Sequence, residues 1–189
     1  MGQTVGMKRL HRLPVTALAL ALLCAGPLLA QSGDQLGPMM ASFKAGIFCA
    51  PKVVSTTPAP DTVAGVTNVI EEVPPFVSAG RNVPAVLGMG FGILSGSKQQ
   101  MLLDVLVVVT HPPMGDAGVT RQSYYTDITN MGESMTLYQF DYDYELVQGP
   151  WTITATQGDE VLFRAGFTVV PPQQVPELAG VCGYENLLS

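Results

Sequence analysis

The chain is short of the side chains that most catalytic and metal sites need. It has 2 histidines and 3 cysteines among 189 residues, and only 13% of its residues are charged. His11 lies near the N-terminus, so His111 is the one histidine in the rest of the chain. Zinc or copper sites with several histidine ligands are therefore excluded. The sequence also lacks a Cys-x-x-Cys pair, a phosphate-binding glycine loop and a Gly-x-Ser-x-Gly elbow, which argues against zinc ribbons, nucleotide sites and α/β-hydrolases.

Positive charge is also scarce. The chain has 9 lysines and arginines against 15 acidic residues, a net charge of -6. Three of the basic residues (Lys8, Arg9 and Arg12) precede an apolar run, and without them the balance is 6 to 15, or -9. An acidic surface repels phosphate groups, so we expect neither nucleic acid nor anionic lipid as a partner.

The first thirty residues contain the pattern of a secretory signal peptide. The basic residues just named are followed by an apolar run over Leu13–Leu29 and by the small residue Ala30. This order predicts cleavage after Ala30 and export to the periplasm. A retained membrane anchor is disfavoured because the run is short and contains prolines. A lipoprotein modified at Cys24 is disfavoured because the bulky Leu23 precedes that cysteine. We expect no transmembrane segment in the mature chain.

Cys49 and Cys182 are the cysteines outside the predicted signal peptide. Export to an oxidising compartment predicts a disulfide between them. A redox-active or metal-binding pair is the alternative, but the two residues are far apart in the sequence. The chain-entropy model gives at most about 5 kcal/mol of stabilisation for so long a loop.

The apolar pattern predicts an all-β fold. Apolar residues recur mainly at every second position, and 15 prolines and 20 glycines interrupt the chain too often for long helices. The predicted strands are Phe43–Cys49, Val63–Glu72, Val83–Ser95, Leu102–Thr110, Gln122–Thr129, Leu137–Leu146, Trp151–Thr156 and Val161–Val169. Their spacing favours an antiparallel immunoglobulin-like β-sandwich of about seven to eight strands. We expect a flexible segment over residues 31–41, a single domain over 42–189, and a helical turn over Pro176–Ala179.

The predicted strand Leu137–Leu146 alternates aromatic and acidic residues. Its aromatic face is expected to point to the core, and the last three strands are expected to form a meander. Asp141, Asp143 and Glu145 would then share the opposite face. A solvated acidic face is the favoured interpretation. A calcium site is the weaker one, because calcium ligands usually come from a loop that wraps the ion.

Two further features allow alternative interpretations. His111 and Met114 flank a Pro-Pro pair and would bind copper(I) weakly, whereas a histidine that ends a strand and hydrogen-bonds in the turn is the simpler interpretation. The glycines of the predicted strand, Gly88, Gly90 and Gly92, lack the spacing of a dinucleotide loop. They are expected to allow close packing on one face of a strand. We predict no catalytic residue and no cofactor.

Five short stretches stand out for their composition: Gly46–Cys49, Pro60–Gly65, Val73–Val77, Thr110–Gly115 and Leu178–Tyr184. They resemble a family of exported bacterial proteins classed as a domain of unknown function. The resemblance implies a bacterial, periplasmic setting and carries no activity, cofactor or site residue with it.

Taken together, the sequence favours a non-enzymatic binding or interaction module of the bacterial cell envelope, with an envelope protein as its partner. Binding would use an exposed sheet edge or the loops at Val73–Phe76 and His111–Gly115. The alternative is a metal-binding or hydrolytic protein that uses His111 and nearby acids. Because sandwiches host many functions, the fold alone does not decide between them.

Overall fold

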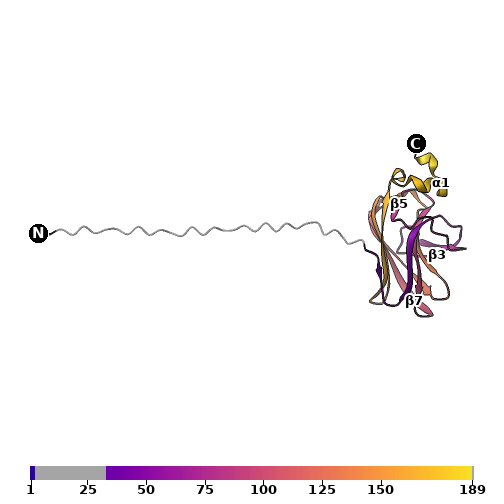
Figure 1. The fold of residues 1–189 in the computed structure, drawn as a ribbon, viewed down its shortest axis with the longest axis horizontal. Helices are drawn as coiled ribbons and strands as arrows, with labels where there is room; N and C mark the ends of the chain where they lie inside the picture. The colour runs from indigo at the N-terminus through magenta and orange to yellow at the C-terminus, as the bar shows by residue number, and fades with distance from the viewer. Residues whose placement is uncertain (3–32, 189) are drawn as a thin grey trace. The chain divides into compact units, whose positions relative to one another are not determined.

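The computed structural model describes residues 1–2 and 33–188, so the predicted signal peptide lies, from residue 3 onward, outside the described residues. Residues 33–188 form a domain of strands joined by turns (Figure 1). The strands are β1 Gln35–Leu36, β2 Met40–Cys49, β3 Val53–Pro58, β4 Val66–Ile70, β5 Asn82–Pro84, β6 Met89–Ser97, β7 Met101–Met114, β8 Val119–Thr129, β9 Ser134–Gln139, β10 Gly149–Gln157 and β11 Glu160–Val170. Across this described part, no helix is both long and apolar enough to cross a membrane.

The strands form two sheets that pack against each other and one separate hairpin. The larger sheet has the order β1-β11-β10-β7-β8, with β5 paired in parallel to β11. The smaller sheet has the order β2-β6-β9, and β3 pairs with β4. The order of both sheets matches that of an immunoglobulin fold. In the smaller sheet, β2, β6 and β9 correspond to strands A, B and E. In the larger sheet, β11, β10, β7 and β8 correspond to strands G, F, C and C′. The structure thus confirms the predicted immunoglobulin-like sandwich.

Aromatic side chains from both sheets fill the space between them. The ring of Phe91 on β6 lies 5.6 Å from that of Trp151 on β10 and 4.7 Å from that of Phe167 on β11. Phe140, just after β9, is 5.8 Å from both Phe91 and Trp151. Rings of this kind bury on the order of 150–250 Å² each, so this cluster accounts for much of the adhesion between the sheets.

Glycines allow close approach on one face of the smaller sheet. A Cβ atom on Gly90 would overlap the ring of Phe48, and one on Gly92 would overlap the backbone of Thr136. The predicted packing role is therefore confirmed for these two glycines. Gly88 differs, because it lies in the turn before β6 with a φ of 79°, a conformation that glycine adopts without strain.

The structure differs from the predicted arrangement of strands in three places. The segment 31–41 contains β1, which pairs with β11, and the start of β2, so its second half is not free of the sheets. The predicted strand Val83–Ser95 is divided at residues 85–88 into β5 and β6. The sequence predicts no strand over Val53–Pro58, where β3 pairs with β4. Every residue of β3 is exposed, so it lacks the apolar alternation by which strands are recognised.

The predicted meander is wrong at its first strand. β10 and β11 form the expected hairpin, but β9 ends at Gln139 and pairs with β6 in the other sheet. The backbone N–H groups of Asp141 and Tyr142 donate to the Glu145 carboxylate, at 2.6 and 2.9 Å, instead of continuing a ladder. The chain then forms a 3-10 turn over Asp143–Glu145, η1, before it reaches the larger sheet.

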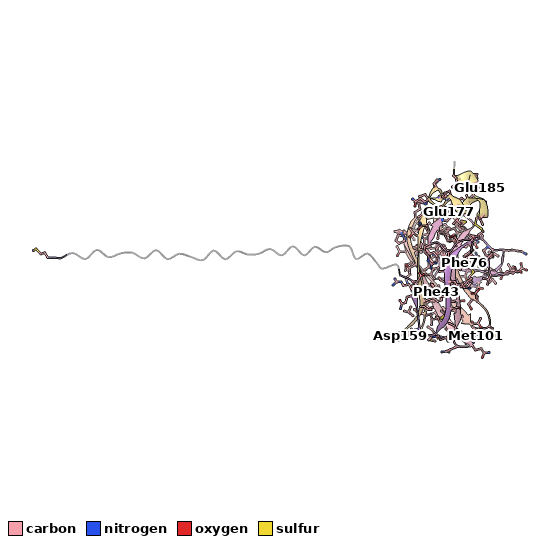
Figure 2. All side chains as sticks on the ribbon, viewed as in Figure 1. Phe43, Phe76, Met101, Asp159, Glu177 and Glu185 are labelled. Atoms are coloured by element: carbon pink, nitrogen blue, oxygen red, sulfur yellow. A yellow bond between two sulfur atoms is a disulfide. The ribbon has the colours of Figure 1, made fainter. Side chains whose placement is uncertain are left out.

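The predicted disulfide is present. Cys49 at the end of β2 is bonded to Cys182 at the end of helix α1, Ala179–Cys182, with 5.4 Å between the two Cα atoms. The predicted helical turn corresponds to the 3-10 turn η3, Pro176–Leu178, and the start of α1. Two labelled residues of this segment, Glu177 and Glu185, lie at one end of the sandwich, and Met101 and Asp159 lie at the other (Figure 2).

Candidate binding cleft

A cleft of about 450 Å³ lies between the β3–β4 hairpin and the strands β8 and β9. β8 is the last strand of the larger sheet and β9 the last of the smaller one, so the cleft opens where both sheets end. Its volume falls in the range of ligand sites, about 300–1,000 Å³. The lining combines hydroxyl groups, amides and aliphatic side chains, among them Thr57, Thr67, Asn68, Tyr125, Leu137 and Tyr142. This mixture suits a ligand with both apolar and hydrogen-bonding parts.

Buried polar groups join the strands around the cleft. Gln122 on β8 donates from Nε2 to the hydroxyl of Tyr138 on β9 at 3.2 Å, and Tyr138 donates to Glu145 Oε1 at 2.9 Å. Gln122 Oε1 accepts from the backbone N–H of Val63, in the loop between β3 and β4, at 2.7 Å. One amide side chain therefore links both sheets and the hairpin loop. In a low-dielectric interior such a network fixes geometry when all its members are paired.

Glu145 is 5% exposed and anchors one end of this network. Its carboxylate accepts from Tyr138 and from the backbone of Asp141 and Tyr142. Burial raises the pKa of Glu145, and the hydrogen bonds that it accepts act in the opposite direction. A raised carboxyl pKa marks candidates for acid catalysis. Here, however, both oxygens are engaged by the chain itself, which assigns Glu145 a structural role.

His111 anchors the other end. It is 6% exposed, and its ring lies 4.7 Å from that of Trp151. Nδ1 is 2.8 Å from the carbonyl oxygen of Pro112, so Nδ1 carries the proton and Nε2 accepts from Gln122 Nε2 at 3.1 Å. Burial lowers the pKa of His111, and the bond to Pro112 opposes this shift. The neutral imidazole has an amide and a carbonyl as partners, rather than the carboxylate and serine of a hydrolytic triad.

The structure separates the acidic residues expected on one strand face. Asp141 is exposed and accepts from Asn68 Nδ2 at 2.7 Å, Asp143 is exposed in η1, and Glu145 is buried. The interpretation as a shared acidic face is therefore wrong, because the strand ends before these residues. Within the described residues, no group of three or more histidine, cysteine or acidic side chains is placed to hold a metal ion.

Met114, the other predicted copper ligand, is fully buried. Its sulfur lies 3.8 Å from both Gln122 Nε2 and the Tyr138 hydroxyl. His111 and Met114 thus meet around the Gln122 amide, which fills the space between them.

Among the described residues, one side chain of the cleft lining has a buried polar atom without a partner. Gln139 is 9% exposed and lines the cleft beside Asp141. Its Nε2 donates to Asp141 Oδ1 at 2.6 Å, which fixes the orientation of the amide. Gln139 Oε1 is buried and has no hydrogen-bond partner among the residues that the structure describes. An unpaired buried acceptor costs about 1–3 kcal/mol, so a donor that reached Gln139 Oε1 would recover part of that cost.

The sequence points to the two ends of this network but not to its centre. His111 and Glu145 have side chains that mark them as candidates for chemistry, whereas Gln122, Tyr138 and Gln139 fall within predicted strands and carry no such mark. A signal was present for Gln122, because this polar residue occupies the same strand face as Tyr124. The residues that it contacts are 11, 16 and 59 positions away, and no local pattern shows such contacts.

Comparison with known proteins identifies the family. A search of curated proteins finds no match. Among solved structures, an immunoglobulin-like protein from Pseudomonas aeruginosa is similar, with 19% sequence identity and a TM-score of 0.45 over 75% of this chain and 99% of that chain. A family model described as a domain of unknown function matches residues 36–169, which include the strands and turns that form the cleft. Since this match covers well over half of the sequence, the chain belongs to the DUF3859 family.

Proposed function

We propose that this protein is a non-enzymatic binding module of the bacterial cell envelope and that the cleft beside β8 and β9 is its ligand site. The observation that supports this proposal most concerns Gln139, a residue of the cleft lining whose Oε1 is buried and has no hydrogen-bond partner within the described part of the chain. Buried polar atoms are normally paired, and a bound ligand would supply the missing donor.

The titratable groups near the cleft support binding rather than catalysis. Glu145 is engaged through both oxygens, and the His111 ring is held through both nitrogens. A general acid or base must reach a substrate proton, and neither group has a free position to do so. The exposed Asp141 contacts two amide side chains, an arrangement that suits recognition.

The disulfide supports the proposed location. Structural disulfides persist in oxidising compartments, and Cys49–Cys182 joins residues 133 positions apart. We therefore propose that the chain is cleaved after Ala30 and that the mature protein is periplasmic. Expression of the full chain in a Gram-negative host tests this location: periplasmic protein that begins at Gln31 is expected, and uncleaved protein confined to the cytoplasm would contradict it.

Site-specific photocrosslinking tests the ligand site. A benzophenone amino acid is placed at Tyr142, which lines the cleft and is 48% exposed, or at Leu36, which is 50% exposed on β1. After irradiation of cells that export the full chain, intact-mass spectrometry detects adducts of any size. A discrete adduct at Tyr142 but not at Leu36 is expected. Equal labelling at both positions, or none at either, would refute the proposed site.

A further inference from the structure

We infer that the cleft binds an extended, positively charged peptide, which pairs as an additional strand with the free edge of β8 at Tyr125. This inference rests on the proposed function, because it names the class of ligand for the same cleft. Three independent features support it: the direction of the β8 backbone groups, the point at which the loop 59–65 stops covering that edge, and the chemistry of the lining.

The backbone of β8 has hydrogen-bonding groups that face away from β7. The N–H of Ser123 donates to the carbonyl oxygen of Asp61 at 3.1 Å, so it points out of the β7–β8 ladder. Pairing with β7 is regular from Arg121 to Thr126, and backbone direction alternates along a strand. The N–H and C=O of Tyr125, two residues after Ser123, therefore point the same way.

The chain covers only part of this edge. The loop between β3 and β4 contacts β8 through Asp61, at Ser123, and through Val63, whose N–H donates to Gln122. Tyr125 is the next outward-facing position; it lines the cleft and is 69% exposed. β8 is a terminal strand of its sheet in the described structure. An open edge of this kind is a template for an added strand.

The lining sets the charge of the ligand. Within the described chain, the charged side chains that line the cleft are both acidic. Asp141 is exposed and meets a ligand directly, whereas Glu145 is buried and bonded to the chain, so it adds negative charge from behind the surface. Gln139 Oε1 adds an acceptor that needs a donor. A ligand that supplies N–H groups and positive charge is complementary to these groups, whereas an acidic or phosphorylated peptide would be repelled. A peptide containing lysine or arginine fits both requirements.

Selection from a random peptide library displayed on phage, against the full oxidised chain, tests the inference. Enrichment of peptides with lysine or arginine and few prolines is expected. The best peptide is then synthesised, and its Kd is measured by calorimetry for four variants. Tyr125→Pro removes the outward N–H without removing a β7–β8 hydrogen bond, a position where strands tolerate proline. Tyr125→Ala keeps that N–H and is the matched control.

Tyr125→Pro is expected to raise Kd by about tenfold, and Tyr125→Ala by much less. Asp141→Asn is expected to weaken binding and reduce its salt dependence. Asp159→Asn, at the end of the sandwich marked in Figure 2, is expected to leave Kd unchanged. Protection of the Tyr125 amide from hydrogen exchange on peptide binding would show the pairing directly. If Tyr125→Pro and Tyr125→Ala raise Kd equally, the inference that the peptide pairs as a strand with β8 is wrong.

The outcomes separate this inference from the proposed function. If no peptide is enriched while Tyr142 still gives an adduct in cells, the peptide assignment is wrong and the ligand site remains. If the adduct at Tyr142 is absent as well, both the proposed ligand site and the peptide assignment are wrong. Binding of N-acetylglucosamine oligomers that Tyr125→Pro leaves unchanged would overturn the peptide class. A dimer of the isolated chain that Tyr125→Pro makes monomeric would assign the edge to a second copy and would also overturn the inference.

Discussion

Gln122 and Tyr138 lie in different sheets, yet the amide Nε2 of one is 3.2 Å from the hydroxyl oxygen of the other. The pair holds β8 and β9 together where both sheets end, and so it sets the width of the cleft. Gln122 is 4% exposed, so water cannot easily replace a partner that is lost. The cleft therefore depends on two lining side chains that are bonded to each other.

Replacement of Gln122 by leucine is expected to lower the free energy of unfolding by about 1–3 kcal/mol, because the Val63 N–H and the Tyr138 hydroxyl lose a buried partner. Urea denaturation of the full chain measures this loss. Tyr125→Leu, at an exposed position of the same strand, is the control and is expected to change stability by less than about 0.5 kcal/mol.

The double variant Gln122→Leu with Tyr138→Phe tests whether the pair acts as a unit. The two losses are expected to sum to more than the loss of the double variant, with a coupling of about 0.5–3 kcal/mol. If the losses in the free energy of unfolding of the two single variants add up to that of the double variant, the hydrogen bond between Gln122 and Tyr138 contributes little to stability.

Acid is expected to destabilise the fold through His111. Its pKa is lowered from 6.5 by burial in the folded protein, so below pH 6.5 the unfolded chain takes up a proton that the folded chain does not. The free energy of unfolding therefore falls as the pH drops below about 6.5. Glu145 acts in the opposite direction, because its pKa is raised above 4.5 and the folded state is protonated first.

The variant His111→Asn separates the two effects. Its amide nitrogen replaces Nδ1 as the donor to Pro112, but the side chain does not titrate. The stability difference between about pH 7.5 and about pH 5.5 is expected to be smaller than in the natural protein. An unchanged difference, measured by urea denaturation at both pH values, would assign the acid effect to other groups.

Removal of the disulfide is expected to cost about 2–5 kcal/mol, because the unfolded chain gains freedom over a loop of 133 residues. The double variant Cys49→Ala, Cys182→Ala isolates this effect from that of a free thiol. Urea denaturation of the natural chain with and without reductant gives the comparison. The reduced chain and the double variant are expected to agree, and equal stability of the oxidised and reduced chains would contradict the entropic account.

Local patterns predicted the fold better than the cleft. Alternation in Trp151–Thr156 and Val161–Val169 identified the β10–β11 hairpin, because adjacent strands with a short turn are encoded within one stretch of sequence. The alternation continues through Asp143 and Glu145, however, although the chain leaves the sheet after Gln139. The contacts that end β9 are hydrogen bonds from backbone N–H groups to a side chain, and residue periodicity does not report them.

The hairpin of β3 and β4 shows a second limit of the sequence. The two strands bury little apolar surface. Contacts with the rest of the domain therefore help to hold the hairpin in place. Examples are the bond from Asn68 to Asp141 and that from Val63 to Gln122. Apolar spacing therefore predicts only half of this wall: β4 lies within the predicted strand Val63–Glu72, whereas β3 is not predicted. The disulfide, by contrast, follows directly from the cysteine count and the expected compartment.

The glycines of β6 give a final prediction about the smaller sheet. Gly90→Ala would place a methyl group in overlap with the Cε2 and Cζ atoms of the Phe48 ring, which is fully buried. Overpacking of this kind costs about 1–3 kcal/mol, so a lower melting temperature is expected in calorimetry. Gly132→Ala is the matched control, because its Cβ would meet nothing within 4 Å. Phe48→Leu in the Gly90→Ala background is expected to restore part of the loss by making room for the methyl group; no recovery would show that the strain lies in the backbone of β6 rather than in the ring.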